Sequence, residues 1–294
     1  MKRLAIAILF LIALIVSIVS LSGCISQKDA HSQVRVATTI IPLGEFVQAV
    51  GGDRVSVTVL VPPGADPHTF EPAPSQIQAV ADADVYVENG AGLESWMGSI
   101  LQVNPHMLVI DTSKGISLLT GTGGEDTAGG INAADPHIWL TPRDAIIQVR
   151  NICDGLVQFD PSDKDYYINN RESFIKKLED LDVYLNSTFA GTKEKKFIVL
   201  HPAWTYFARD YGLTQIAIEA EEKEPGPRYL AEVVDTAKAN NITTVFVEPQ
   251  YNPKSAEVIA NEINGKVISI DDLAPNYIDN LRSVGEKIAQ SLRS

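Results

Sequence analysis

Four of the five histidines in this 294-residue chain stand beside prolines, and three of them lie near the ends of predicted strands, whereas His106 lies in a surface-like Asn104-Pro105-His106 turn. His68 and His137 each end an Asp-Pro-His tripeptide, and His201 precedes a proline directly after the apolar run 197–200. Because proline fixes its own backbone angle, side chains next to it are held in stiff turns. Imidazole nitrogens suit borderline metals such as zinc. These three histidines therefore predict a preorganised metal site.

A carboxylate is expected to complete the ligand set. Asp271 comes directly after the predicted strand 267–270, and open parallel sheets bind ligands beyond the carboxyl ends of their strands. Its neighbour Asp272 and a water molecule are the alternatives for the fourth position. A structural interpretation competes with this one, because a histidine beside a proline or an acid after a strand can simply cap a turn. The recurrence of three histidines in such places favours the metal site.

The elements that must position these side chains alternate between strand-like and helix-like patterns, which predicts an α/β fold with parallel sheets. In the first half we expect strands at 34–39, 55–61, 84–87 and 108–110, and helices at 43–51, 74–81, 94–101 and from Thr141-Pro142-Arg143 onward. In the second half we expect strands at 197–200, 215–218, 245–247 and 267–270, and helices at 202–211, 228–240, 253–264 and 278–292.

The longest helical pattern lies between these two halves. It opens at Asp160-Pro161-Ser162 and carries apolar residues at helical spacing to about Phe189. We expect it to link two lobes, with the metal site in the cleft between them. The predicted domains are an N-terminal α/β lobe at 34–161, a linking helix at 162–190 and a C-terminal α/β lobe at 191–294.

The N-terminus predicts export and a lipid anchor. Lys2 and Arg3 precede a mostly apolar stretch at 4–19, and Leu21-Ser22-Gly23-Cys24 resembles the lipobox of prokaryotic lipoproteins. We expect 1–24 to comprise a signal peptide and a lipidated Cys24, followed by a polar tether at 25–33. An uncleaved signal-anchor is the alternative. Both interpretations place the body outside the cytoplasm.

Composition narrows the class of partner. A formal net charge of -13 argues against nucleic acid as a partner. If Cys24 is lipidated, Cys153 is the other of the two cysteines, so no intramolecular disulfide is expected. The glycine-rich tract 121–130 can bury almost nothing and is expected to form a flexible loop.

The segments 61–72, 135–140 and 201–208 resemble the signature segments of the zinc and manganese solute-binding proteins of ABC importers. The resemblance runs from about Val34 to the C-terminus. It implies two four-stranded lobes bridged by one rigid helix, a metal in the interlobe cleft, and delivery to a membrane permease energised by a cytoplasmic ATPase. His68, His137 and His201 match the three histidine ligand positions of the family, and Asp271 matches its carboxylate position.

The resemblance also bears on the metal. Family members with a glutamate at the third histidine position are associated with manganese, so His201 favours Zn²⁺, with Mn²⁺ or iron as the alternative. Two features depart from the family pattern. The tract 121–130 replaces a histidine-rich loop, and Glu224-Pro225-Gly226 stands where Glu-Pro-Ser is usual.

The expected function is a high-affinity metal receptor, lipid-anchored on the extracytoplasmic face of the membrane, monomeric and not an enzyme. A zinc hydrolase is disfavoured because the chain has no His-Glu-x-x-His motif and a fourth carboxylate would close the site. An adhesin-like surface lipoprotein and a receptor for organic iron chelates or corrinoids are further alternatives. Metal binding is expected to weaken as pH falls past 6.5, where histidines ordinarily protonate.

Overall fold

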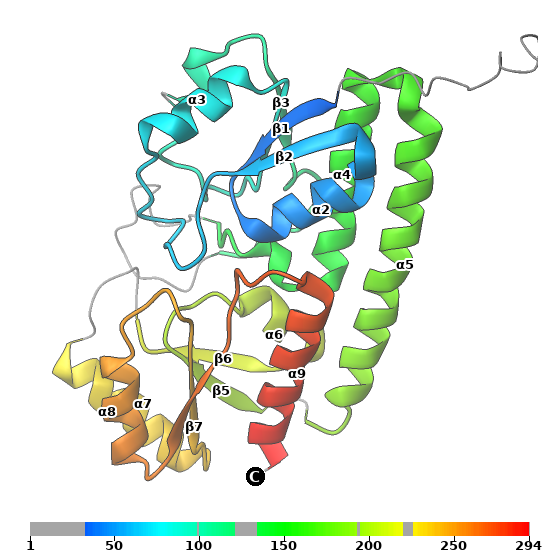
Figure 1. Ribbon diagram of the computed structural model, residues 1–294. Helices are drawn as coiled ribbons and strands as arrows, with labels where there is room; N and C mark the ends of the chain where they lie inside the picture. The colour runs from blue at the N-terminus through cyan, green and yellow to red at the C-terminus, as the bar shows by residue number, and fades with distance from the viewer. Residues whose placement is uncertain (1–32, 99, 121–133, 193–194, 220–225, 294) are drawn as a thin grey trace, which may run out of the picture. The chain divides into compact units, whose positions relative to one another are not determined.

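Two parallel four-stranded sheets organise the computed structural model, which describes residues 33–98, 100–120, 134–192, 195–219 and 226–293 (Figure 1). The first sheet has the order β2-β1-β3-β4 and contains β1 (Val34–Thr38), β2 (Val55–Val59), β3 (Val85–Glu88) and β4 (Leu108–Asp111). The second has the order β6-β5-β7-β8 and contains β5 (Lys196–Val199), β6 (Thr214–Ala217), β7 (Thr244–Val247) and β8 (Lys266–Ser269). The predicted fold class is confirmed.

The inner strands of both sheets are mostly apolar and mostly buried. In β1, Val36 pairs with Val57 on one side and with Val85 on the other, and all four residues of β7 are buried. A parallel sheet covered by helices buries both of its faces, so its strands lose the polar alternation of half-exposed strands. All eight predicted strands are present, displaced by one or two residues at their ends.

Helices α2 (Ile41–Gly51), α3 (Pro74–Asp82) and α4 (Pro142–Phe159) belong to the first half of the fold. Each of them has a proline in its first two positions, where the missing N–H costs no hydrogen bond and the fixed φ suits a helix. The 3-10 turn η3 (Ile138–Leu140) precedes α4. It follows His137 directly and therefore helps to place that side chain.

The predicted helix at 94–101 is wrong. The described residues of this segment form turns, followed by the 3-10 turn η2 (Leu101–Val103). Tertiary hydrogen bonds account for the difference, because the Glu94 carboxylate accepts from the Thr39 hydroxyl and the indole of Trp96 donates to Pro67 O. The same carboxylate also accepts the backbone N–H groups of Asn89 and Gly90 in the preceding turn. Ala91 and Gly92 also adopt positive φ. These contacts override the local helical pattern.

The predicted linking helix is present as α5 (Lys164–Thr188), whose 25 residues span about 37 Å. It packs against α2 and α4 in the first half and against α9 (Tyr277–Arg293) in the second, and Figure 1 shows it passing both sheets. Gly285 of α9 approaches Leu185 so closely that a Cβ atom there would lie 2.3 Å from Leu185 Cδ2. Because Gly285 has no side chain, α9 can pack closely against α5 at this position.

The second sheet is accompanied by α6 (Thr205–Tyr211), α7 (Pro227–Ala239), α8 (Lys254–Glu262) and α9. All four helices were expected, but α6 begins three residues later than the pattern at 202–211 indicates. The intervening residues form a turn in which Ala203 N donates to His201 O and Trp204 N donates to the Gln215 side chain. This turn carries His201 beyond the end of β5.

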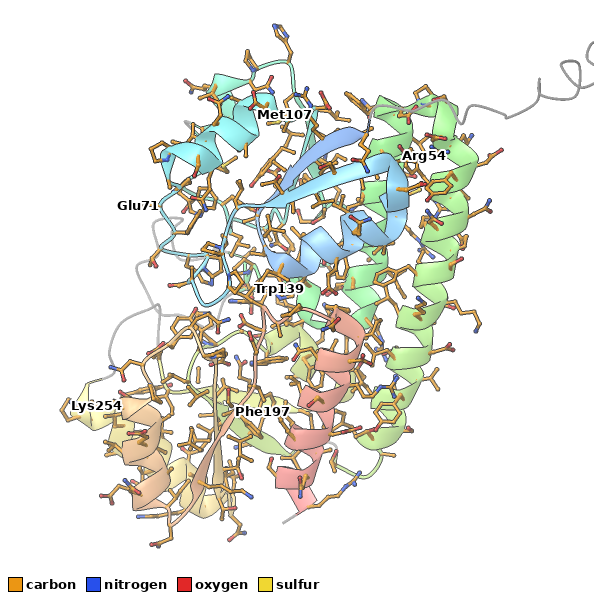
Figure 2. All side chains as sticks on the ribbon, viewed as in Figure 1. Arg54, Glu71, Met107, Trp139, Phe197 and Lys254 are labelled. Atoms are coloured by element: carbon orange, nitrogen blue, oxygen red, sulfur yellow. The ribbon has the colours of Figure 1, made fainter. Side chains whose placement is uncertain are left out.

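The two halves share one apolar core and are also joined by buried hydrogen bonds. Trp139 of η3, at the junction of the halves in Figure 2, is fully buried and donates from its indole to Asp272 O at 2.7 Å. The Tyr277 hydroxyl of α9 donates to Trp139 O at 2.7 Å. The two lobes are therefore in direct contact beside the predicted site.

Several sequence-based expectations lie outside the described residues. These are the signal peptide, Cys24, the tether through residue 32, the whole tract 121–130 with its continuation to 133, and Glu224-Pro225. Within the described chain, no helix is both long enough and apolar enough to cross a bilayer.

Candidate metal centre

The three predicted histidines converge on one point. His68 lies in the loop after β2, His137 at the entry to η3, and His201 directly after β5. His137 Nε2 lies 3.1 Å from His68 Nε2 and 3.1 Å from His201 Nε2. Each histidine offers one ring nitrogen, and these three atoms all lie within 4.8 Å of one another. Among the described residues, the three histidines are the group of His, Cys, Asp or Glu side chains that meets this distance limit.

These separations suit a tetrahedral metal. With bonds of 2.0–2.1 Å to nitrogen, two ligand atoms on a tetrahedral zinc ion stand about 3.3 Å apart. The spacing from His137 to each of its neighbours is 3.1 Å. Adjustments of a few tenths of an ångström would therefore admit the ion. A local structural role for three turn-capping histidines would not require this convergence.

His137 is oriented by a carboxylate. Asp135 Oδ1 accepts hydrogen bonds from His137 Nδ1 at 2.8 Å and from His137 N at 2.9 Å, and both residues are buried. An ionised carboxylate accepts and does not donate, so the His137 proton is assigned to Nδ1 and the Nε2 lone pair points into the site. A carboxylate behind a ligating imidazole fixes its tautomer and raises its basicity.

The turn that carries His137 is held from both halves of the fold. Asn89, at the end of β3, donates to Pro136 O at 2.8 Å, and Gln148 of α4 in turn donates to the Asn89 side-chain oxygen at 3.2 Å. From the other half, the Tyr206 hydroxyl of α6 donates to Asp135 O at 2.7 Å. His137 is thus fixed at the seam between the lobes.

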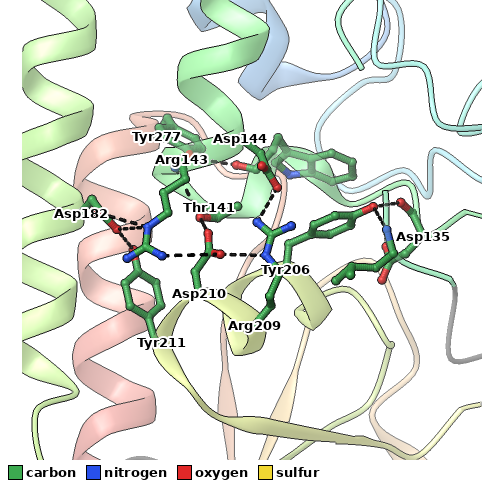
Figure 3. Close-up of polar contacts among 12 residues, drawn as sticks. Asp135, Thr141, Arg143, Asp144, Asp182, Tyr206, Arg209, Asp210, Tyr211 and Tyr277 are labelled. Atoms are coloured by element: carbon green, nitrogen blue, oxygen red, sulfur yellow. Dashed lines mark hydrogen bonds and ion pairs between the residues drawn. The ribbon is translucent and has the colours of Figure 1, made fainter. Parts of the chain in front are cut away.

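A network of charged side chains extends this seam toward α5. Figure 3 shows Arg209 of α6 between two carboxylates, with its guanidinium 2.8 Å from Asp144 and 2.7 Å from Asp210. The same guanidinium lies over the Tyr206 ring, 5.0 Å from its centroid. Arg143, at the start of α4, pairs with Asp182 of α5 at 3.2 Å. Charged groups that are partly buried and multiply bonded limit sliding of the lobes at this position.

His68 is placed by its own Asp-Pro-His tripeptide. Asp66 accepts from His68 N at 2.9 Å and from the Thr69 hydroxyl at 3.0 Å, which is the same backbone bond that Asp135 makes to His137. The repeated tripeptide therefore encodes a repeated turn. The pKa of His68 is lowered to about 4, mainly by burial and to a smaller extent by the nearby His137. Its imidazole is neutral at neutral pH, as a metal ligand must be.

His201 lies in a more enclosed environment and is 3% exposed. Glu248 accepts from His201 N at 3.3 Å and from the Trp204 indole at 2.9 Å. Tyr251 stacks on the imidazole, with ring centroids 4.4 Å apart and planes at 15°. Burial lowers the pKa of His201 well below its usual value, and burial together with Asp272 raises the pKa of Glu248 well above its own.

The predicted carboxylate Asp271 is not part of the histidine cluster. Its Oδ1 accepts from Gln250 Nε2 and from Leu273 N, each at 2.9 Å. The adjacent Asp272 is 4% exposed, and its Oδ1 has no hydrogen-bond partner among the described residues. Burial raises the pKa of Asp272 to about 7, although the interaction with His137 lowers it in part. Of the two carboxylates, Asp272 is therefore the one with a buried oxygen that has no hydrogen-bond partner among the described residues.

Sequence reasoning did not identify the supporting groups Asp135, Glu248 and Tyr251. The repeated aspartate of Asp-Pro-His was a visible signal for Asp135. Glu248 and Tyr251 lie 47 and 50 positions from His201, and their positions depend on how β5 and β7 pair. Local pattern alone therefore offers no signal for them.

Three imidazoles that converge between two parallel sheets, with a long helix alongside both, define a two-lobed metal-binding protein. Residues 36–291 match the family described as "Zinc-uptake complex component A periplasmic", ZnuA, and the chain belongs to that family. The resemblance seen in the histidine segments is therefore confirmed at family level.

Individual relatives and one solved structure agree with this assignment. The chain is 33% identical over 279 residues to the high-affinity zinc uptake system protein ZnuA of Bacillus subtilis, which covers 90% of this chain and 88% of that protein. It is 31% identical over 249 residues to the manganese-binding lipoprotein MntA of Halalkalibacterium halodurans, covering 82% and 81% respectively. A crystal structure of ZnuA matches with a TM-score of 0.83 at 41% identity, over 89% of this chain and all of that one.

Proposed function

We propose that this chain is the extracytoplasmic receptor of a metal importer and that it captures Zn²⁺ between its lobes. The observation that carries the proposal is the meeting of three Nε2 atoms, supplied by His68, His137 and His201, at spacings close to those of a tetrahedral ion. Family membership supports transport rather than catalysis as the use of the metal. The ion is the cargo, so the site must both bind and release it.

The ligand chemistry supports zinc over manganese. Three imidazole nitrogens form a borderline-soft donor set, whereas Mn²⁺ prefers carboxylate, carbonyl and water oxygens. Manganese is the alternative cargo, and this alternative is supported by a relative that is named for manganese binding. Because zinc also binds more tightly than manganese at almost any nitrogen site, affinity for zinc alone does not establish preference.

The fourth ligand is proposed to be a carboxylate of the pair Asp271 and Asp272. Family resemblance supports Asp271, whereas the unpartnered buried oxygen supports Asp272. A water molecule would be the ligand if neither side chain rotates into the site. Each of the three arrangements leaves the histidines as the main source of affinity.

The proposed setting is the outer face of the membrane. Cleavage before Cys24 and lipidation of that cysteine would anchor the chain, with 25–33 as tether, 34–161 and 191–294 as lobes and 162–190 as the linking helix. The proposed partners are a membrane permease and its cytoplasmic ATPase, with the receptor acting as a monomer. Relatives named as lipoproteins of metal binding support this location.

Metal competition tests the proposal. The full-length protein, purified in detergent and stripped with chelator, is offered zinc and manganese together at fixed pH, and bound metal is counted by mass spectrometry. We expect one equivalent of zinc, retained against excess manganese, and a raised melting temperature, since a ligand that binds only the folded state stabilises it. Manganese holding the site against zinc would reverse the cargo, and failure to bind either ion would reject the receptor assignment.

A further inference from the structure

We propose that Tyr251 is a positioning residue that joins the loops of two metal ligands across the site and slows release of the ion. The inference rests on the proposed function, because it concerns the same three histidines. Tyr251 lies in the turn that follows β7, in the second half of the fold. It contacts one ligand by its ring and the loop of another by its hydroxyl.

The ring contact is with His201. The two rings are 4.4 Å apart and nearly parallel, at 15°, so Tyr251 covers one face of the imidazole. A bound divalent cation withdraws charge from the imidazole and makes its face more attractive to an electron-rich aromatic ring. The stacking contact should therefore be stronger with the ion bound than without it. Such a contact stabilises the occupied state preferentially.

The hydroxyl contact reaches the first half of the fold. The Tyr251 hydroxyl donates to Asp66 Oδ1 at 3.4 Å, and Asp66 is the residue that shapes the His68 turn through its bonds to His68 N and Thr69. At 3.4 Å this is a long hydrogen bond, which a small approach of the two loops would shorten. The contact therefore links the loop of His68 to the side chain that covers His201.

Burial indicates which ligand moves when the ion leaves. His137 and His201 are each 3% exposed, whereas His68 is only half-buried and its neighbour Thr69 is exposed. The His68 loop is thus the side of the site nearest to solvent. Displacing that loop to release the ion would break the bond between Tyr251 and Asp66. Removal of this bond should accelerate release more than it slows capture.

Two substitutions separate the two contacts. Tyr251→Phe keeps the ring and removes the hydroxyl, whereas Tyr251→Leu removes both. The matched control is Tyr229→Phe, which deletes a hydroxyl that donates to Ala217 O on an exposed tyrosine of the same half. Zinc-loaded full-length protein is mixed with excess chelator in a stopped-flow instrument, and the dissociation rate is compared with the equilibrium affinity and the melting temperature of the metal-free protein.

We expect Tyr251→Phe to release zinc about threefold faster and Tyr251→Leu about tenfold faster, as the loss of one modest hydrogen bond and then of a stacked ring requires. Association rates and metal-free melting temperatures should match those of Tyr229→Phe. Release rates equal to the control would overturn the proposal, as would faster release that merely follows a loss of metal-free stability. If the wild-type protein retains no zinc, the receptor assignment itself fails, and the wild-type measurement reveals this before any variant is compared.

Discussion

The Nε2 atoms of His68 and His137 lie 3.1 Å apart although 69 positions separate the two residues in the chain. His201, a further 64 positions along, brings its Nε2 within the same distance of His137. Three buried or half-buried imidazoles at such close range cannot all carry a positive charge, since like charges repel strongly in a medium of low dielectric constant. The lowered pKa values of His68 and His201 agree with this requirement.

Replacing any one of the three histidines should weaken zinc binding. His68→Ala, His137→Ala and His201→Ala are each expected to lower the affinity more than tenfold, about 1.4 kcal/mol or more, because each removes one coordinate bond. Competition with a zinc chelator measures the change, and circular dichroism checks that the metal-free protein is folded. His106→Ala is the control, since His106 is exposed and also follows a proline. Unchanged affinity in any two of the three variants would contradict the site assignment.

Asp135→Asn tests the support behind His137. The substitution removes the charge that raises the basicity of the imidazole and fixes its tautomer, so zinc affinity should fall by about 10- to 100-fold. Calorimetry gives the affinity, and Asp154→Asn, at a carboxylate that is 76% exposed, provides the control for loss of charge. An affinity equal to that of the control would show that the hydrogen bond to Nδ1 positions the ring without tuning the metal.

The two adjacent carboxylates can be distinguished by amide substitution. Because Asp272 has the unpartnered buried oxygen, Asp272→Asn should lower zinc affinity more than tenfold, while Asp271→Asn should have a smaller effect through the Leu273 turn. X-ray absorption of the zinc-loaded variants would report the loss of one oxygen ligand. A larger loss in Asp271→Asn would restore the ligand that the family resemblance indicated.

The pH dependence of zinc affinity should come from the carboxylate and not from His68 or His201. The pKa of His68 is lowered to about 4, so protons do not compete for it near pH 6.5 as the sequence alone suggested. The pKa of Asp272 is raised to about 7. If Asp272 is a ligand, it must lose a proton to bind zinc below pH 7, and affinity should fall by up to about tenfold per pH unit there. Titrations from pH 7.5 to 5 should show a steeper slope in wild type than in Asp272→Asn.

Tyr206→Phe tests the seam between the lobes. The substitution leaves Asp135 O and Leu119 N without their buried partner, so the free energy of unfolding should fall by about 1–3 kcal/mol. Urea denaturation measures this, with Tyr229→Phe as the exposed control. A loss no larger than that of the control would mean that other contacts hold the His137 turn.

Much of the fold was predictable because its signals are local. Runs such as Val34–Thr38 and Thr244–Val247 are rich in β-branched residues, and the proline starts of α2, α3 and α4 mark their helices within a few residues. The segment 94–101 failed for the opposite reason. Its helical pattern is real, but Glu94 is bonded to Thr39 and Trp96 to Pro67, which lie 55 and 29 positions away in the chain.

The sequence by itself determined which side chains can bind a metal and which local turns present them, because Asp-Pro-His sets the backbone around His68 and His137 through bonds two residues apart. The tertiary structure alone decided that these turns meet, that Asp135 also bonds the His137 ring, and that Tyr251 covers His201. The uncommitted oxygen of Asp272 likewise emerged only there. Turn geometry depends on neighbouring residues, whereas convergence depends on strand pairing and on packing between lobes far apart in the chain.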